Sequence, residues 1–290
     1  MRRLLAAAAL AAAALCAPAT GHAQTRLPVH TMPVRTAALP RPLTGALPIT
    51  FHGGAVMTGH VNVYLIWYGN WPASSARRAV VTDFVRHLPS PWWAINQTFP
   101  SSTGKVVAND ISLAGEYADR YSVGKANLTD DQIDAVVTNA IHSHALPKDI
   151  HGVYLVLTSS DVTKQGFLTQ YCGWHTYDTI DGSTIKFGFI GDPSGPKVTQ
   201  CIPTAASPNK DAGGDAMVSA IGHELAETVT DPTMNGWRTS TGEENADRCA
   251  WNYGTTYKVG GAPANMKLGS RHFLIQTNWV NDRKPHCGLA

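Results

Sequence analysis

Along the middle of the chain, short apolar runs alternate with segments whose apolar residues have helical spacing. Residues 61–68 are rich in β-branched and aromatic side chains and end at a glycine, which predicts a strand. Residues 75–88 carry apolar side chains at helical spacing and stop at Pro89, which predicts a helix. By the same reasoning, three further strands are expected over residues 111–118, 153–157 and 185–190.

The sequence predicts two more helices from the capping residues at their N-termini. Thr129 and Gln132 form a capping-box sequence ahead of an apolar stripe at helical spacing. Another helix is predicted over residues 215–230, with Asp215 as its N-cap and Pro232 ending it. The residues that follow show no clear period.

The alternation of strands and helices predicts a single α/β domain over residues 51–290, built on a mostly parallel sheet. A sheet followed by one helix that bears histidine and glutamate is the layout of zincin metalloproteases. We therefore expect a zincin-like active-site helix, on the strength of a fold-level analogy.

The N-terminus has the pattern of an export signal. Arg2 and Arg3 precede 12 apolar residues, and small residues stand at the expected cleavage point after Ala23. The apolar run is shorter than the ~20 residues of a membrane-spanning helix. We expect a signal peptide over residues 1–23, a proline-rich extended or disordered arm over residues 24–50, and a secreted protein, extracellular or periplasmic, without a membrane anchor.

Charge and cysteine usage narrow the class of protein. The formal charge of +2 includes Arg2 and Arg3, so the chain after cleavage carries +2 − 2 = 0 and has no basic cluster for nucleic acid or anionic lipid. An even number of cysteines follows the leader, which predicts two disulfides in an exported chain. Proximity favours the pairs Cys172–Cys201 and Cys249–Cys287, and a four-cysteine zinc site is disfavoured because no C-x-x-C pair is present.

The strongest chemical motif is IGHELAETVTDP. On a helix, His223 and Glu227 are four residues apart and project from one face, where two ligands can hold one metal ion. Glu224 stands where H-E-x-x-H enzymes keep the general base that activates a metal-bound water. Glu227 replaces the usual second histidine, and a carboxylate lowers the Lewis acidity of a bound zinc ion.

A third ligand is expected from GEENADRC, where Glu244 and Asp247 lie 17 and 20 residues beyond Glu227 and share a face if the stretch is helical. His175, in a loop around Cys172, and Asp231 are additional candidates. The alternatives stay open. Glu227, Asp231, Glu244 and Asp247 can instead form a structural calcium site, and such residues on an exposed helix are commonly only solvated or ion-paired.

Several stretches together resemble the EXORDIUM family, also called phosphate-induced proteins. They are VNVYLIWYGNW, FVRHLPSPWW, GVYLVLTSSDV, QGFLTQYCGWH and AETVTDP, and the likeness covers roughly residues 51–249. The resemblance implies an extracellular protein associated with the cell wall and with growth responses, for which the plant members have no established catalytic activity.

Two hypotheses follow. In the first, a secreted EXORDIUM-like protein holds a divalent metal, zinc before calcium, and hydrolyses a substrate, most plausibly a peptide, with Glu224 as base. In the second, it is a non-enzymatic extracellular or wall-associated factor in which the same residues are structural or bind calcium. A peptide or a cell-wall component is the expected partner in either case.

Overall fold

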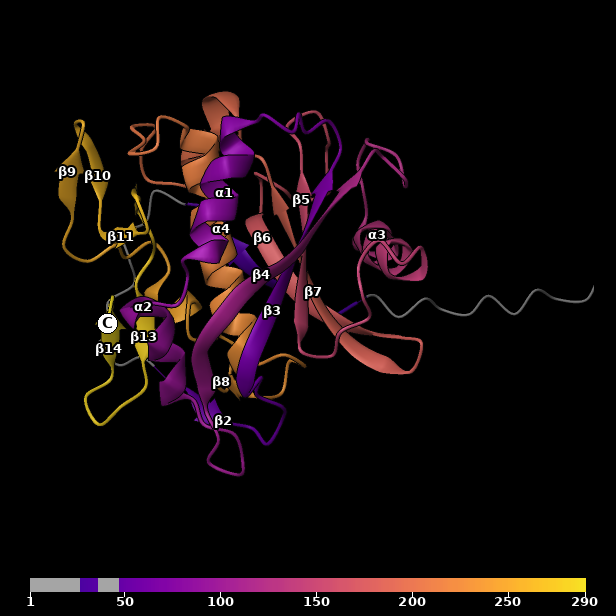
Figure 1. Ribbon diagram of the computed structural model, residues 1–290. Coiled ribbons are helices and arrows are strands. Elements are labelled where there is room, and N and C mark those ends of the chain that lie inside the picture. Colours follow the sequence, from indigo (N-terminus) through magenta and orange to yellow (C-terminus); the bar gives the residue numbers. More distant parts are fainter. Residues whose placement is uncertain (1–26, 36–46) are drawn as a thin grey trace, which may run out of the picture.

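The computed structural model describes residues 27–35 and 47–290. The expected signal peptide and most of the proline-rich arm lie outside the described residues. A six-stranded sheet stands at the centre, with helices on both of its faces (Figure 1). Its strands, in spatial order, are β1 (His30–Pro33), β6 (Tyr171–Ile180), β7 (Ser183–Gly191), β5 (Gly152–Thr158), β3 (Gly59–Tyr68) and β4 (Val107–Asp119).

The sheet is mixed and largely parallel. Strands β7, β5, β3 and β4 run parallel to one another, as the alternation of elements predicted. Strand β6 runs antiparallel to both of its neighbours, β7 and β1. One expectation is corrected here, because the residues around Cys172 form strand β6 and not a loop. Part of the arm that was expected to be extended or disordered forms the edge strand β1, which the sequence did not predict as a strand.

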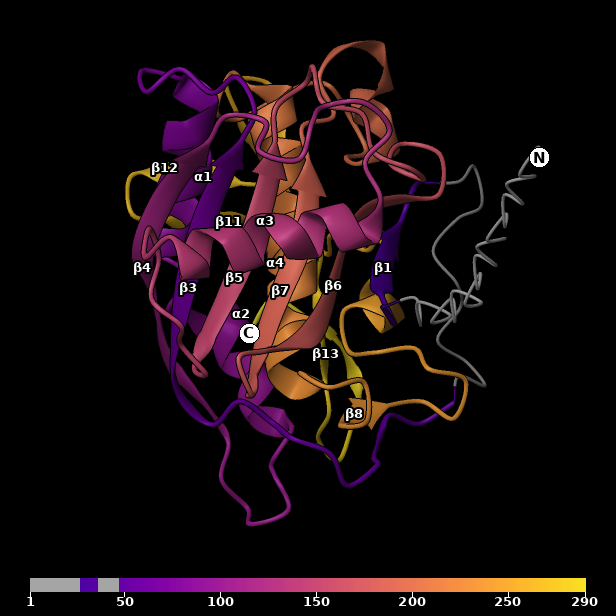
Figure 2. The same cartoon turned by 90° about the vertical axis from the view of Figure 1, so that its right-hand side faces the viewer.

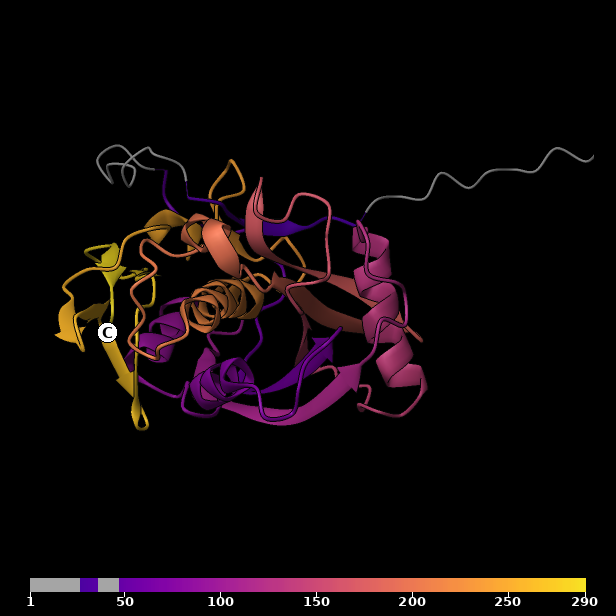
Figure 3. The same cartoon turned by 90° about the horizontal axis from the view of Figure 1, so that it is seen from above.

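Two helices cover one face of the sheet and one covers the other (Figures 2 and 3). Helices α1 (Ala76–Arg86) and α4 (Ala212–Thr230) pack over the face that carries the side chains of Val63, Leu65 and Trp67. Helix α3 (Asp130–His142) crosses the opposite face, over the alternate residues of the same strands. Short α2 (Pro91–Ala94) and η1 (Ile95–Thr98) follow α1.

The caps explain where the helices begin. The capping box of α3 is confirmed, because the Gln132 amide donates to the Thr129 hydroxyl at 3.3 Å and the Thr129 amide donates to the Gln132 side chain at 3.0 Å. The expected N-cap of α4 was wrong. Asp211 caps this helix by accepting the Gly214 amide at 2.9 Å, while Asp215 lies inside the first turn and accepts from the side chain of Asn209.

Short two-stranded ribbons occupy the region after α4. They are β2 (Thr50–Phe51) with β8 (Trp237–Arg238), β9 (Tyr257–Val259) with β10 (Ala262–Ala264), β11 (Met266–Leu268) with β12 (Arg271–Phe273), and β13 (Asn278–Val280) with β14 (His286–Gly288). Strands of two or three residues are too short to show a period, which is why the sequence read as irregular. In the connections, η2 (Gly195–Gln200) precedes α4 and η3 (Asp247–Cys249) follows β8.

Both predicted disulfides are confirmed, Cys172–Cys201 and Cys249–Cys287, with Cα atoms 5.5 and 5.6 Å apart. The first joins β6 to the segment before α4, and the second joins the end of η3 to β14. Within residues 27–35 and 47–290, no helix is both long and apolar enough to cross a membrane.

Candidate metal centre

Helix α4 runs through the core, and all of its 19 residues except Ala212 are buried. Most of its side chains are small or apolar, as burial on every side requires. His223, Glu224 and Glu227 are the ionisable exceptions beyond its first turn. They share one side of the helix, because residues three and four apart lie one turn from each other. The His223 Nε2 atom lies 3.1 Å from a Glu227 carboxylate oxygen.

Strand β6 supplies a second imidazole. His175 is almost completely buried, and its Nδ1 atom lies 3.0 Å from Glu224 Oε2 and 3.7 Å from Glu227 Oε2. Its Nε2 atom lies 3.7 Å from Glu244 Oε2. The sequence placed this histidine in a loop above the site. A strand holds it more firmly, since the sheet fixes the direction of each side chain.

The segment between β8 and η3 brings the downstream carboxylates to α4. Asn245 is buried and donates its side-chain amide to the Ala226 carbonyl of α4 at 3.2 Å. The Asp247 amide then donates to Glu227 Oε1 at 2.9 Å, and the Glu244 amide donates to Asp247 Oδ2 at 3.2 Å. Glu244 and Asp247 do not share a helical face, because the stretch is not a continuous helix and Glu244 lies in the irregular segment before η3. Both carboxylates nevertheless lie beside imidazoles, Glu244 beside His175 and Asp247 beside His223. We call this group of ionisable side chains around α4 the α4 cluster.

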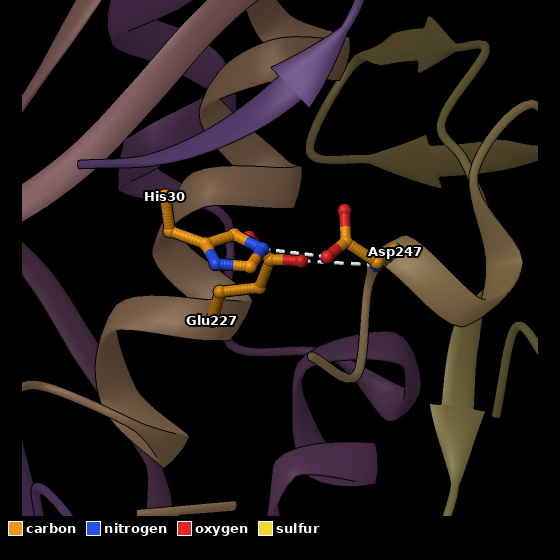
Figure 4. A group of neighbouring side chains, drawn as sticks. All are labelled: His30, Glu227 and Asp247. Carbon is orange, nitrogen blue, oxygen red and sulfur yellow. Dashed lines mark hydrogen bonds and ion pairs between the residues drawn. The ribbon is translucent and has the colours of Figure 1, made fainter. Parts of the chain in front are cut away.

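A third imidazole comes from the N-terminal strand and was missed from the sequence. Figure 4 shows His30 of β1 pointing toward Glu227 and Asp247. Its Nε2 atom lies 2.6 Å from Asp247 Oδ2, and its Nδ1 atom lies 3.3 Å from Glu244 Oε1. The available signal was a short extended run between two prolines, which an edge strand tolerates.

Asp231, an additional candidate from the sequence, has a different contact. It is the C-cap residue of α4, and its Oδ1 atom accepts the Gly236 amide at 2.5 Å, which closes the turn after the helix. Its other oxygen has no hydrogen-bond partner. Asp231 is therefore next to the cluster in sequence, but its Oδ1 atom is engaged in the turn after α4.

Burial and mutual charge shift the protonation of the cluster. Burial raises the pKa of Glu224 to about 7, and burial together with the Asp247 charge raises the pKa of Glu227. Burial also lowers the pKa of His175 to about 4, which leaves a neutral imidazole at neutral pH. Burial opposes the charged form of His30 too, but the carboxylates of Glu227 and Asp247 outweigh it and raise that pKa to about 9.

The pKa values of His223 and Glu244 are set by the same two effects, burial and neighbouring charge. Burial disfavours charge on His223, yet neighbouring carboxylates, Glu227 first, hold its pKa well above the ordinary value. For Glu244, burial and the Glu227 charge raise the pKa strongly. The raised pKa values mean that, without a bound metal ion, protons on these side chains neutralise the negative charge of the cluster.

Several polar atoms in this cluster have no hydrogen-bond partner although they are buried. They are His175 Nε2, both ring nitrogens of His223, Glu227 Oε2 and Glu244 Oε2. Buried polar groups are normally satisfied, and an unsatisfied group calls for an explanation such as an ion. Two sets of three side chains place ligand atoms within 4.8 Å of one another, namely His30, Glu227 and Asp247, and His175, Glu224 and Glu227. Nitrogen and carboxylate donors in this number suit a divalent cation.

Comparison with known proteins identifies the family to which the chain belongs. The model of the phosphate-induced protein 1 conserved region matches residues 49–271. The chain belongs to the phosphate-induced protein 1 family. It is 33% identical to EXORDIUM-like 5 of Arabidopsis thaliana over 83% of this chain and 77% of that protein. It is 31% identical to EXORDIUM-like 3 of the same plant, over 80% of each chain, and 30% identical to PHOSPHATE-INDUCED 1 of Nicotiana tabacum, over 65% of this chain and 66% of that protein.

The family assignment agrees with the resemblance seen in the sequence and spans the residues of the cluster except His30. No solved structure matches the chain. In this member of the phosphate-induced protein 1 family, the case for a metal therefore comes from the side chains of the cluster themselves.

Proposed function

We propose that this protein binds a zinc ion at the α4 cluster and hydrolyses a peptide bond there. The observation that carries the proposal is the convergence of three imidazoles and four carboxylates in the core, with several of their atoms unsatisfied. Burying so many ionisable groups costs free energy unless they are paired or coordinate a metal. A bound cation offsets that cost.

His223, Glu227 and Asp247 are the proposed ligands. Donor atoms about 2.1 Å from a tetrahedral zinc ion lie about 3.4 Å from one another. The His223 Nε2 atom is 3.1 Å from Glu227 Oε1 and 3.5 Å from Asp247 Oδ1, which matches two edges of such a tetrahedron. Three protein ligands leave a fourth position for water, as catalytic zinc sites require. The proposed ligand set would resemble that of a zincin helix, with a carboxylate as second ligand.

Glu224 is the proposed general base. A bound zinc ion supplies Lewis acidity and lowers the pKa of its water toward neutrality. With zinc bound, Glu224 would accept the proton of the activated water, the role that this position has in H-E-x-x-H enzymes. His175 orients this carboxylate, because its Nδ1 atom lies 3.0 Å from Glu224 Oε2.

The donor set favours zinc over calcium. Calcium takes oxygen ligands almost exclusively, whereas imidazole suits zinc and other transition metals. The sequence alone suggested an oxygen-rich alternative that included Asp231. His30 and His175 in the two candidate ligand groups, and His223 beside Glu227, favour the nitrogen-containing site. We further propose that the protein acts after export, which the leader-like N-terminus and the two disulfides support.

Metal analysis and one isosteric variant test the proposal. Protein purified without chelator is expected to contain about one zinc ion per chain. Glu224→Gln is expected to keep the zinc and to lose at least about a hundred-fold of the hydrolysis rate on a pool of unstructured peptides, whose cleavage sites mass spectrometry identifies. Glu116→Gln is the matched control, since Glu116 lies on β4 beside Arg78, away from the cluster.

The outcomes separate the two hypotheses. Zinc retained in both variants, with cleavage lost only in Glu224→Gln, supports a hydrolase. Zinc bound without cleavage in the unmodified protein leaves a metal-stabilised, non-enzymatic factor. Protein that takes up neither zinc nor another transition metal rules out the proposed site, and a thermal shift with calcium alone assigns the cluster to a structural calcium ion.

A further inference from the structure

Strand β1 is the edge strand of the central sheet and lies beside the candidate site. It pairs antiparallel with β6, with His30 opposite His175 and Met32 opposite Gly173. Beyond β1 the attachment continues, because the Val34 amide donates to the Gln170 carbonyl at 3.0 Å. Strand β6 would otherwise present an unpaired edge beside α4, and such an edge is a ready template for another extended segment.

The side chains of β1 alternate as a strand requires, so His30 and Met32 face the same way. His30 enters the acidic cluster, as described above. Met32 is completely buried and packs in the core beside α4, where the Gln276 side-chain amide lies 3.6 Å from its sulfur. Pro33 is exposed and marks an irregularity in the pairing with β6. One buried apolar side chain therefore anchors this short strand.

The same strand engages the proposed base. The Met32 amide donates to Glu224 Oε1 at 2.9 Å, while Glu224 Oε2 is beside His175. Gly173 makes this approach possible, because a Cβ atom at that position would lie 2.6 Å from the Ile190 side chain and 3.4 Å from Glu224 Oε1. Each carboxylate oxygen of Glu224 therefore has a partner in the resting protein, one on β1 and one on β6. The Met32 amide of β1 thus lies directly beside the carboxylate that is the proposed base.

We propose that the edge of β6 beside α4 is a binding site for an extended peptide and that β1 occupies it in the resting protein. This inference rests on the proposed function, because it names the substrate class of the same site. An incoming peptide pairs antiparallel with β6 in place of β1. It places an unbranched apolar side chain where Met32 lies, and a basic or imidazole side chain two residues earlier, facing Glu244 and Asp247.

Binding of the strand's own sequence tests this site without any need for turnover. The probe is a fluorescein-labelled synthetic peptide of residues 27–35, LPVHTMPVR, and fluorescence anisotropy follows its binding to the full chain. Met32→Asp places a charge in a fully buried position and unseats β1. Pro33→Asp places the same charge one residue further, on an exposed position, and is the matched control.

The apparent Kd of the peptide is expected to fall at least about ten-fold in Met32→Asp relative to the unmodified protein, because the competing internal strand is removed. Pro33→Asp is expected to behave like the unmodified protein, and a scrambled peptide is expected not to bind. Hydrogen exchange of the residues 171–176 is expected to quicken in Met32→Asp and to slow again when the peptide is added.

A folded Met32→Asp protein that binds the peptide no better than the unmodified protein overturns the proposal, as does equal binding of the scrambled peptide. If Met32→Asp fails to fold, Met32→Ala replaces it and must show a smaller gain in the same direction. The measurements are repeated with chelator and with zinc. Peptide binding without zinc uptake leaves this inference standing and removes the proposed hydrolase, whereas zinc uptake without peptide binding does the reverse.

Discussion

Glu227 is the residue that both groups of candidate ligands share, so its substitution by glutamine discriminates best between a metal site and a set of ion pairs. Glutamine keeps the shape of the side chain and can still accept the Asp247 amide, which lies 2.9 Å from Glu227 Oε1. It removes the negative charge. Burial and the Asp247 charge both raise the pKa of Glu227, so that charge is unfavourable in the metal-free protein.

The expected effect of Glu227→Gln on the melting temperature therefore depends on whether zinc is present. Without metal, Glu227→Gln should unfold at the same temperature as the unmodified protein or higher. At a free zinc concentration of about 100 times Kd, binding stabilises the unmodified protein by about 2.7 kcal/mol. An unfolding entropy of about 0.5 kcal/mol per kelvin, as for a domain of about 250 residues, converts this into a rise in Tm of about 5 °C. Glu227→Gln should show little of that rise.

Differential scanning fluorimetry at pH 7.5, with chelator and then with buffered zinc, measures both halves of the prediction. Glu116→Gln serves again as the control and should follow the unmodified protein throughout. The reasoning fails if Glu227→Gln is the less stable protein in chelator, because that result would mean that the ion pair between Glu227 and His223 stabilises the fold by itself. It fails equally if zinc raises both melting temperatures alike.

Two further predictions concern other parts of the molecule. Burial first, and then nearby carboxylates, raise the pKa of Asp134 on α3 to about 6. Because the raised pKa belongs to the folded state, this group costs stability as the pH rises from about 4 through about 6. Asp134→Asn should therefore be more stable at pH 7.5, on the order of 1 kcal/mol after screening, and equal at pH 4 in urea titrations. Replacing Cys249 and Cys287 by serine should lower the free energy of unfolding by about 2–5 kcal/mol in the same assay. It should also weaken zinc binding, because Cys249 is two residues from Asp247. An unchanged zinc affinity would contradict that coupling.

Much of the fold could be predicted from local patterns. The strands β3, β5 and β7 and helices α1 and α3 have strong periodicity or clear caps, and each lies where the sequence placed it. Strand β6 was missed because cysteine and glycine at its start, in Tyr171–Ile180, suggested a loop. Strand β1 was missed because prolines flank it, although an edge strand tolerates them.

The candidate site was only partly predictable, and for a similar reason. The spacing of His223, Glu224 and Glu227 is a property of one helix, so local sequence reveals it. The distance of Asp247 from Glu227 along the chain was informative only by comparison with known metal sites. His30 lies 217 residues before its partner Asp247, and no local pattern connects two such positions. Only the pairing of β1 with β6 brings this imidazole to the cluster.

Helix α4 is at once the middle of the core and the carrier of the cluster, and this has a consequence for how the molecule responds to damage. Many enzymes keep their reactive groups on surface loops, so an altered site leaves the scaffold intact. Here His223, Glu224 and Glu227 are buried on α4 and lie against strands β1 and β6 and the segment at η3. A change that leaves one of these charges uncompensated should weaken the fold at its centre, whereas a neutral isosteric change such as Glu224→Gln should remove activity and leave the fold intact.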